Sequence, residues 1–218
     1  MKASHLIILL LALPLMAAAP LRCAGVASPG LAYPAASGQW IGSELDLCHR
    51  AAAALGRSAS FTPILMSADR TSAGGADLLF VPAATVPAGF RRQRLLADDY
   101  LAILVPAGSD VRSAAGLAGL PICVEPGSAE DAALVGYFKA HHWRLNEFVF
   151  QEVDEMHDAY MAGRCDGIVG AVSLLRGLRG NAGNRHFGDR ILPDHLAANP
   201  IVIATRAAEP KLAAAVRE

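Results

Sequence analysis

Short apolar runs bounded by turn-forming residues alternate along the chain with segments of helical periodicity. The runs predict strands over 21–27, 60–66, 76–82, 100–105, 120–125, 148–151, 167–172 and 201–204. The periodic segments predict helices over 43–55, 109–117, 129–141, 154–162, 174–178 and 209–216. Because strands and helices alternate, we expect an α/β fold with largely parallel sheets.

Helix starts and a break near the middle subdivide this pattern. Ser43 with Asp46, and again Ser128 with Asp131, have the spacing of a capping box at the start of a predicted helix. The turn-rich stretch 105–109 separates two series of alternating elements. We therefore expect two βαβ lobes rather than one continuous sheet.

The composition is that of a globular chain. Of its 218 residues, 53% are hydrophobic and 18% are charged, with 19 Lys and Arg against 20 Asp and Glu. This length accommodates one large domain or two small ones, each with its own core. The balanced charge argues against a nucleic-acid-binding protein, which would carry a basic surplus.

Residues 1–19 have the layout of a secretory signal peptide. Lys2 supplies the positive charge, 6–13 form an apolar core, and small residues follow, so we expect cleavage after Ala18. The alternative is an uncleaved anchor, but the run is shorter than the ~20 residues that span a bilayer. The sequence thus predicts an exported protein.

Four cysteines follow the signal segment: Cys23, Cys48, Cys123 and Cys165. An even number in an exported protein favours disulfides. None of them forms a CxxC motif or a Cys/His cluster with zinc spacing, so no metal site is expected. Four cysteines allow three pairings, and their spacing does not choose among them.

Several segments carry a family resemblance. They are LRCAGV (21–26) with GLA (30–32), GQWIG (38–42) with LDLC (45–48), ICVEPGS (122–128), FVF (148–150) and AGRCDG (162–167). In this order they resemble the type 2 periplasmic solute-binding proteins of ABC importers, specifically the amino-acid-binding group (solute-binding family 3) and its general L-amino-acid binders. The resemblance covers about 21–179.

The resemblance implies a periplasmic, two-lobed protein that closes on a small solute by hinge motion. Lobe 1 would comprise 20–105 with 195–218, lobe 2 would comprise 106–194, and the chain would cross near 103–107 and 192–196. It favours the disulfides Cys23–Cys48 and Cys123–Cys165. It also implies a monomer without cofactor or covalent chemistry, whose partner is a permease in the inner membrane.

Two positions of the resemblance concern a carboxylate ligand. Gly127, Ser128 and Ala129 open a helix, where unpaired N–H groups and the helix dipole favour an anion; the alternative is a plain helix cap. The family's cation follows a Thr by three residues. Here Thr85 matches, but the nearest arginines, Arg91 and Arg92, are displaced, so they are either ligand contacts or solvated charges.

Two further positions concern the rest of the solute. The family's acid for the ligand's ammonium group would fall at Ala171, which carries no charge, and nearby Ser173 can only form a hydrogen bond. Tyr33 would be an aromatic wall. These departures favour a small solute that is anionic at one end and lacks an ammonium group.

Two other classes of function compete with transport. An accessory or sensor protein with a degenerate cleft would explain the loss of the arginine and acid positions together. A cleft enzyme of the dehydratase type would need a paired acid and base, and neither Glu125 nor Glu130 has a second catalytic group at a telling spacing. The sequence has no HExxH motif, nucleophile elbow or phosphate-binding glycine loop.

Overall fold

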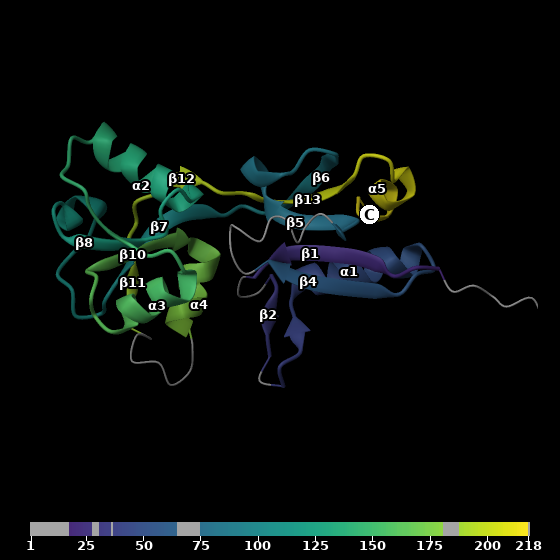
Figure 1. The fold of residues 1–218 in the computed structure, drawn as a ribbon, viewed down its shortest axis with the longest axis horizontal. Coiled ribbons are helices and arrows are strands. Elements are labelled where there is room, and N and C mark those ends of the chain that lie inside the picture. Colours follow the sequence, from purple (N-terminus) through teal and green to yellow (C-terminus); the bar gives the residue numbers. More distant parts are fainter. Residues whose placement is uncertain (1–17, 28–30, 36, 65–74, 181–187, 218) are drawn as a thin grey trace, which may run out of the picture.

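The computed structural model describes residues 18–27, 31–35, 37–64, 75–180 and 188–217, which form two lobes side by side (Figure 1). The first sheet has the strand order β4 (Ala59–Ile64), β1 (Leu21–Val26), β5 (Leu78–Pro82), β13 (Ile201–Arg206) and β6 (Phe90–Ala97). The second has the order β11 (Arg190–Ile191), β7 (Tyr100–Val105), β10 (Gly167–Ala171), β8 (Pro121–Val124) and β9 (Asn146–Val149), and β12 (Ala197–Ala198) also pairs with β7. The predicted two-lobed α/β class is confirmed. The predicted signal segment lies almost wholly outside the described residues.

Each sheet has a parallel part and an antiparallel part. In the first lobe β4, β1 and β5 are parallel, whereas β13 and β6 are antiparallel to their neighbours. In the second, β10, β8 and β9 are parallel, and β7 is antiparallel to β10. The expected parallel strands are therefore present, but both sheets are mixed.

Helices cover the sheets on defined faces. In the first lobe α1 (Ser43–Ala54) and α5 (Pro210–Ala215) bury their apolar residues against one face of the sheet. In the second, α3 (Val153–Met161) and α4 (Val172–Gly180) cover one face, and α2 (Ala129–Ala140) with the 3₁₀ turn η3 (Ala114–Leu117) covers the other. None of the described helices has the length and apolar character needed to cross a bilayer.

At the first crossing the chain passes between the lobes before the predicted stretch 103–107. At the second crossing it does so after the predicted stretch 192–196. β7 and β12 both pair within the second sheet, so Tyr100–Val105 belongs to lobe 2. The predicted boundary after residue 105 had placed this strand in lobe 1 and is wrong. The crossings lie between β6 and β7 and between β12 and β13. The turn-rich stretch 105–109 misled the prediction because it ends a strand rather than a lobe.

Several local predictions are corrected by the structure. β6 was missed because its sequence, FRRQRLLA, is polar and does not alternate. The short strands β2 (Tyr33–Pro34) and β3 (Trp40–Ile41) form a hairpin where a loop was expected. Only Ala114–Leu117 of the helix predicted over 109–117 is helical, and the Ser109 hydroxyl instead accepts from the N–H of Val111 at 3.2 Å.

The start of α1 is also different from the prediction. Gly42, not Ser43, is the N-cap residue, and no side chain caps this end. Gly42 has φ 130°, and a Cβ here would lie 2.2 Å from the Leu31 carbonyl oxygen, so only glycine fits. The capping box at the start of α2 is confirmed, because the Ser128 hydroxyl accepts from the Asp131 N–H at 3.0 Å.

Each lobe contains one disulfide that joins a strand to a later part of the chain. Cys23 in β1 bonds to Cys48 in α1, 25 residues later, and Cys123 in β8 bonds to Cys165, 42 residues later. This confirms the pairing that the resemblance favoured. All four cysteines are buried in the cores. Each disulfide cross-links residues of one lobe, and neither connects the two lobes.

We expect loss of either disulfide to destabilise its lobe. Replacing Cys23 and Cys48 together by Ala, or Cys123 and Cys165 together by Ala, should lower the free energy of unfolding by about 3–4 kcal/mol, because each bond closes a long loop in the unfolded chain. Urea unfolding of oxidised protein, followed by circular dichroism, measures this. A loss under about 1 kcal/mol in both variants would contradict it.

Candidate functional site

The carboxyl ends of the parallel strands face each other at the crossings. Pro82, the last residue of β5, pairs with Ile201, the first of β13, and Ala83 donates its N–H to the Pro200 carbonyl at 2.8 Å. In the second lobe Ala171, the last residue of β10, pairs with Leu101 near the start of β7. Open α/β sheets bind ligands at such strand ends, and Figure 1 shows β1 pointing toward the second lobe.

The turn before α2 uses its N–H donors internally. Gly127 donates its N–H to Oδ2 of Asp131 at 2.6 Å, and the Ser128 hydroxyl caps the helix. Ser128 is buried, whereas Ala129 is exposed. The predicted anion-binding donor of Gly127 is therefore occupied by the protein's own carboxylate.

The same turn lies beside a second acid. Burial, a hydrogen bond that the protonated Glu147 donates to Asp131, and the charge of Asp131 raise the pKa of Glu147, which lies on β9. Two neighbouring carboxyl groups repel each other when both are ionised. The turn before α2 therefore lies beside a pair of acidic side chains.

The end of β10 brings together Ala171, Ser173 and a residue that the sequence analysis overlooked. Asp99 lies at the first crossing and is only 6% exposed. Its Oδ2 accepts from the Ser173 hydroxyl at 2.6 Å, and its Oδ1 accepts from the Tyr100 N–H at 2.9 Å and the Ser173 N–H at 3.4 Å. Ser173 thus faces Asp99. Only the strand register, not the sequence separation, reveals this contact.

The predicted residues of the first lobe do not form one group. Thr85 lies in the 3₁₀ turn η2 (Ala83–Thr85) that follows β5, and its hydroxyl donates to the Pro82 carbonyl at 3.0 Å. Arg91 pairs with Thr205, near the end of β13 that lies away from the crossing. Tyr33 lies on the β2–β3 hairpin opposite Ile41 and is 36% exposed.

Arg92 reaches further toward the crossing than Arg91. Its guanidinium donates to the Ala83 carbonyl, directly after β5, although its backbone lies on β6. Arg92 pairs with Ala204, whereas Arg91 pairs with Thr205, one residue further from the crossing. Of the two displaced arginines, Arg92 is therefore the one that lies beside Thr85 and the strand ends.

A buried acid at the start of α1 was also missed. Glu44 has 0% exposure, and neither carboxyl oxygen has a hydrogen-bond partner among the described residues. Its carboxyl group lies against β1 at Gly25, where a Cβ would be 1.9 Å from Oε2. Burial raises the pKa of Glu44 to about 9, so the group is neutral at pH 7.

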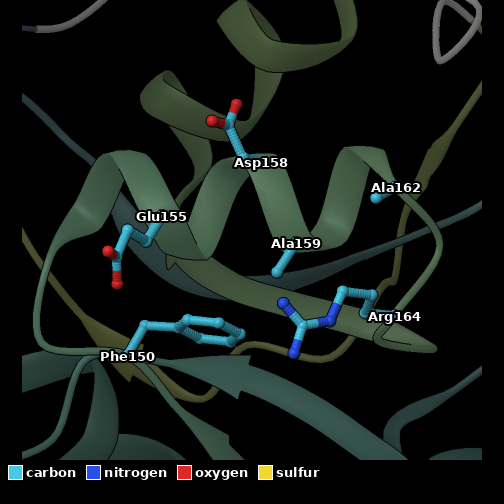
Figure 2. A pocket seen from close by; sticks show the side chains of 6 residues that line it. All are labelled: Phe150, Glu155, Asp158, Ala159, Ala162 and Arg164. Carbon is cyan, nitrogen blue, oxygen red and sulfur yellow. The ribbon is translucent and has the colours of Figure 1, made fainter.

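A separate pocket of about 440 Å³ lies within the second lobe. Figure 2 shows its lining around α3, with the Arg164 guanidinium facing the Phe150 ring and Asp158 directed away from them. Arg164 lies 5.0 Å from the centre of the Phe148 ring and 5.8 Å from that of Phe150. These cation–π contacts hold the arginine at the surface of one lobe, apart from the strand ends at the crossings.

Comparison with known proteins places this geometry in a class. No protein-family model matches the chain. A general L-amino acid-binding periplasmic protein, AapJ of Rhizobium johnstonii, is 30% identical over 189 residues, which are 81% of this chain and 54% of the relative. YhdW of Escherichia coli K12, described as a putative amino-acid ABC transporter-binding protein, is 27% identical over 69% of this chain and 47% of its own length. The chain thus spans about half the length of these curated relatives.

Solved structures agree on the fold. A periplasmic binding protein from Brucella ovis with glutathione bound superposes with a TM-score of 0.78 at 28% identity, covering 91% of this chain and 65% of that one. An ancestral arginine-binding protein bound to glutamine gives 0.72 at 20% identity over 91% of this chain and 88% of that one. The chain therefore has the two-lobed fold of type 2 periplasmic binding proteins. Within this class its sequence is similar to amino-acid-binding proteins of ABC transporters.

We expect Glu44 to make stability depend on pH. Its pKa is about 9 when folded and near 4.5 when unfolded, so its stabilising contribution is complete below pH 4.5 and is lost as the pH rises toward 9. Glu44→Gln keeps the shape without the titration. The free energy of unfolding of the variant minus that of the native protein should therefore be roughly 3 kcal/mol greater at pH 7 than at pH 4.5.

Urea unfolding of both proteins at a series of pH values from 4.5 to 8 measures this difference. Asp46→Asn, which replaces an exposed acid on the same helix, is the matched control and should show no comparable trend. A constant difference between Glu44→Gln and the native protein across this range would contradict the prediction.

Proposed function

We propose that the protein is the exported solute-binding component of an ABC importer and binds a small amino-acid-like or carboxylate solute between its lobes. The observation that supports this is the meeting of the parallel strand ends of both sheets at the two crossings. The similarity to AapJ and YhdW supports the same class of solute. The protein would act in the periplasm as a monomer after cleavage of its signal peptide behind Ala18, and would deliver its solute to an inner-membrane permease.

We further propose that the solute's carboxylate faces the first lobe. The Gly127–Ala129 turn is a weak candidate for this group, because the Gly127 N–H already binds Asp131. Arg92 and Thr85 are better candidates, since Arg92 extends over the end of β5 to the Ala83 carbonyl. A guanidinium group recognises a carboxylate through paired hydrogen bonds.

A thermal-shift screen tests solute binding. The disulfide-bonded protein would be heated with each of the twenty L-amino acids, glutathione, and short mono- and dicarboxylates at millimolar concentration. A solute present at about 100 times its Kd adds roughly 2.7 kcal/mol to the free energy of unfolding and raises Tm measurably. We expect at least one of these solutes to do so. No shift with any of them would contradict the proposed function.

Two arginine variants test the orientation of the solute. Arg92→Ala should weaken binding of the best solute of the screen by about tenfold or more, because a charge-assisted hydrogen bond contributes roughly 1.5–3 kcal/mol. Arg91→Ala removes the same charge from a neighbouring position of the same strand and should change Kd less than twofold. Isothermal titration measures both values. Equal losses in the two variants would argue against a direct contact with Arg92.

A further inference from the structure

The end of the first lobe that lies away from the crossings is rich in basic side chains. The amino ends of β1, β4 and β5 meet there with the start of β6 and the end of β13. The segments concerned are 18–22, 56–60, 75–77, 89–91 and 206–211. We call this surface the basic end. Its charged residues are Arg22, Arg57, Arg91, Arg206 and Lys211 against Asp77 and Glu209.

Three of the arginines gather over one carboxylate. The guanidinium nitrogens of Arg22, Arg57 and Arg206 lie 3.0, 3.4 and 3.8 Å from the nearest Asp77 carboxylate oxygen. The Asp77 side chain is only 8% exposed, whereas those of Arg22 and Arg206 are 54% and 37% exposed. Because a single carboxylate offsets one of three positive charges and lies beneath them, the cluster presents positive charge to solvent.

The neighbouring strand and helix extend this positive surface. Arg91 on β6 pairs with Thr205, the residue before Arg206, and its side chain is exposed. Lys211 lies in the first turn of α5 and is also exposed. Glu209 is the acid nearest to it in sequence. The five basic and two acidic residues of the basic end leave a surplus of three positive charges on a chain whose net charge is −1.

The chain also enters the first lobe at the basic end. Nε of Arg57 donates to the Ala19 carbonyl at 2.8 Å, and its Nη2 donates to the Pro20 carbonyl at 3.0 Å. Figure 1 shows the start of β1 at the end of the first lobe that lies away from the second. The predicted signal segment, with its apolar core over 6–13, directly precedes this point. Since such a segment is held in the membrane until it is cleaved, the basic end is the part of the lobe beside the bilayer at that stage.

The second lobe has the opposite charge. Residues 100–198 contain twelve Asp and Glu against eight Lys and Arg. An anionic surface therefore attracts the basic end and repels the second lobe, which orients the molecule with the basic end toward that surface. The attraction acts within a Debye length of the surface, so it depends on the side chains at this end and not on the net charge of the chain.

We propose that the basic end binds the anionic phospholipid surface of the membrane and so holds the exported protein there. The planar guanidinium group matches the geometry of a lipid phosphate. Each basic residue close to an anionic membrane raises partitioning about fivefold, so a surplus of three charges raises it roughly a hundredfold. The carboxyl ends of β1 and β5 lie at the other end of the sheet, so solute binding and lipid binding are separate properties.

Sedimentation with vesicles tests this proposal. The disulfide-bonded protein would be mixed with vesicles of equal parts phosphatidylcholine and phosphatidylglycerol, or with vesicles of phosphatidylcholine alone. We expect roughly a hundredfold stronger partitioning onto the anionic vesicles. An apolar signal segment would bind both kinds of vesicle, so the ratio isolates the contribution of charge. Raising NaCl from about 0.05 M to about 0.5 M should abolish the difference, because the Debye length becomes short.

Paired variants locate the surface. Arg91→Gln with Lys211→Gln removes two exposed charges from the basic end and should weaken partitioning onto anionic vesicles about twentyfold. Arg91→Lys with Lys211→Arg keeps the charge and should stay within about threefold of the native protein. The matched control is Arg112→Gln with Arg144→Gln, which removes two exposed charges from the second lobe and should change partitioning less than about twofold. The vesicle ratio and salt dependence of the native protein test the proposal even if a variant does not fold.

Four results would overturn the inference. Equal binding to both kinds of vesicle, or none to either, would exclude an anionic lipid surface. Equal losses in the basic-end variant and its second-lobe control would show that net charge, not this surface, is responsible. Displacement by glycerol phosphate at an ionic strength at which NaCl has no effect would indicate a discrete anion site. Self-association without vesicles, lost in the basic-end variant, would make a second copy of the chain the partner. None of these results would alter the proposed solute binding, which the thermal-shift screen tests separately.

Discussion

The two crossings between the sheets are the constraint on which the rest of the structure depends. Asn199 donates its N–H to the Asp99 carbonyl, and Ala83 donates its N–H to the Pro200 carbonyl, so both crossing segments are fixed by backbone hydrogen bonds. These bonds continue the pairing of β12 with β7 and of β13 with β5 into the crossings. Because the parallel strands of a sheet share one direction, their carboxyl ends lie at one edge of each sheet. The disulfides and the cores stabilise each lobe separately, and only the crossings relate one lobe to the other.

The elements that sequence predicted well are those whose hydrophobic pattern is set by complete burial. β7 is fully apolar apart from Tyr100 and has the predicted bounds, and the capping box of Ser128 and Asp131 begins α2 as expected. β6 was missed because it is an edge strand whose pairing is with β13, more than a hundred residues away, and its polar side chains leave no periodic signal. Edge strands commonly carry charges that discourage pairing with other chains.

The candidate site was predicted only where a local motif determines it. The turn at Gly127 was located correctly as the start of a helix, but the sequence could not show that Asp131 folds back onto the Gly127 N–H. Asp99 and Ser173 are 74 residues apart, and their contact follows from strand register alone. Arg91 and Arg92 are neighbours in sequence, yet the alternation of side chains along a strand sends them in different directions. Sequence therefore indicated which types of residue to consider, whereas topology decides which of them meet.

The start of α1 buries the Glu44 carboxyl group in a space that exists only because two neighbouring positions are glycine. The carboxyl group fits against β1 only because Gly25 has no side chain, and the helix begins tightly against Leu31 only because Gly42 has none. At the N-terminus of a helix a negative charge is normally favourable. Here the loss of hydration outweighs that effect, since the pKa of Glu44 rises rather than falls. A helix start without a side-chain cap and with a neutral buried acid is a weakly stabilised element. It lies at the same edge of the first sheet as Thr85, beside the carboxyl ends of β1 and β5.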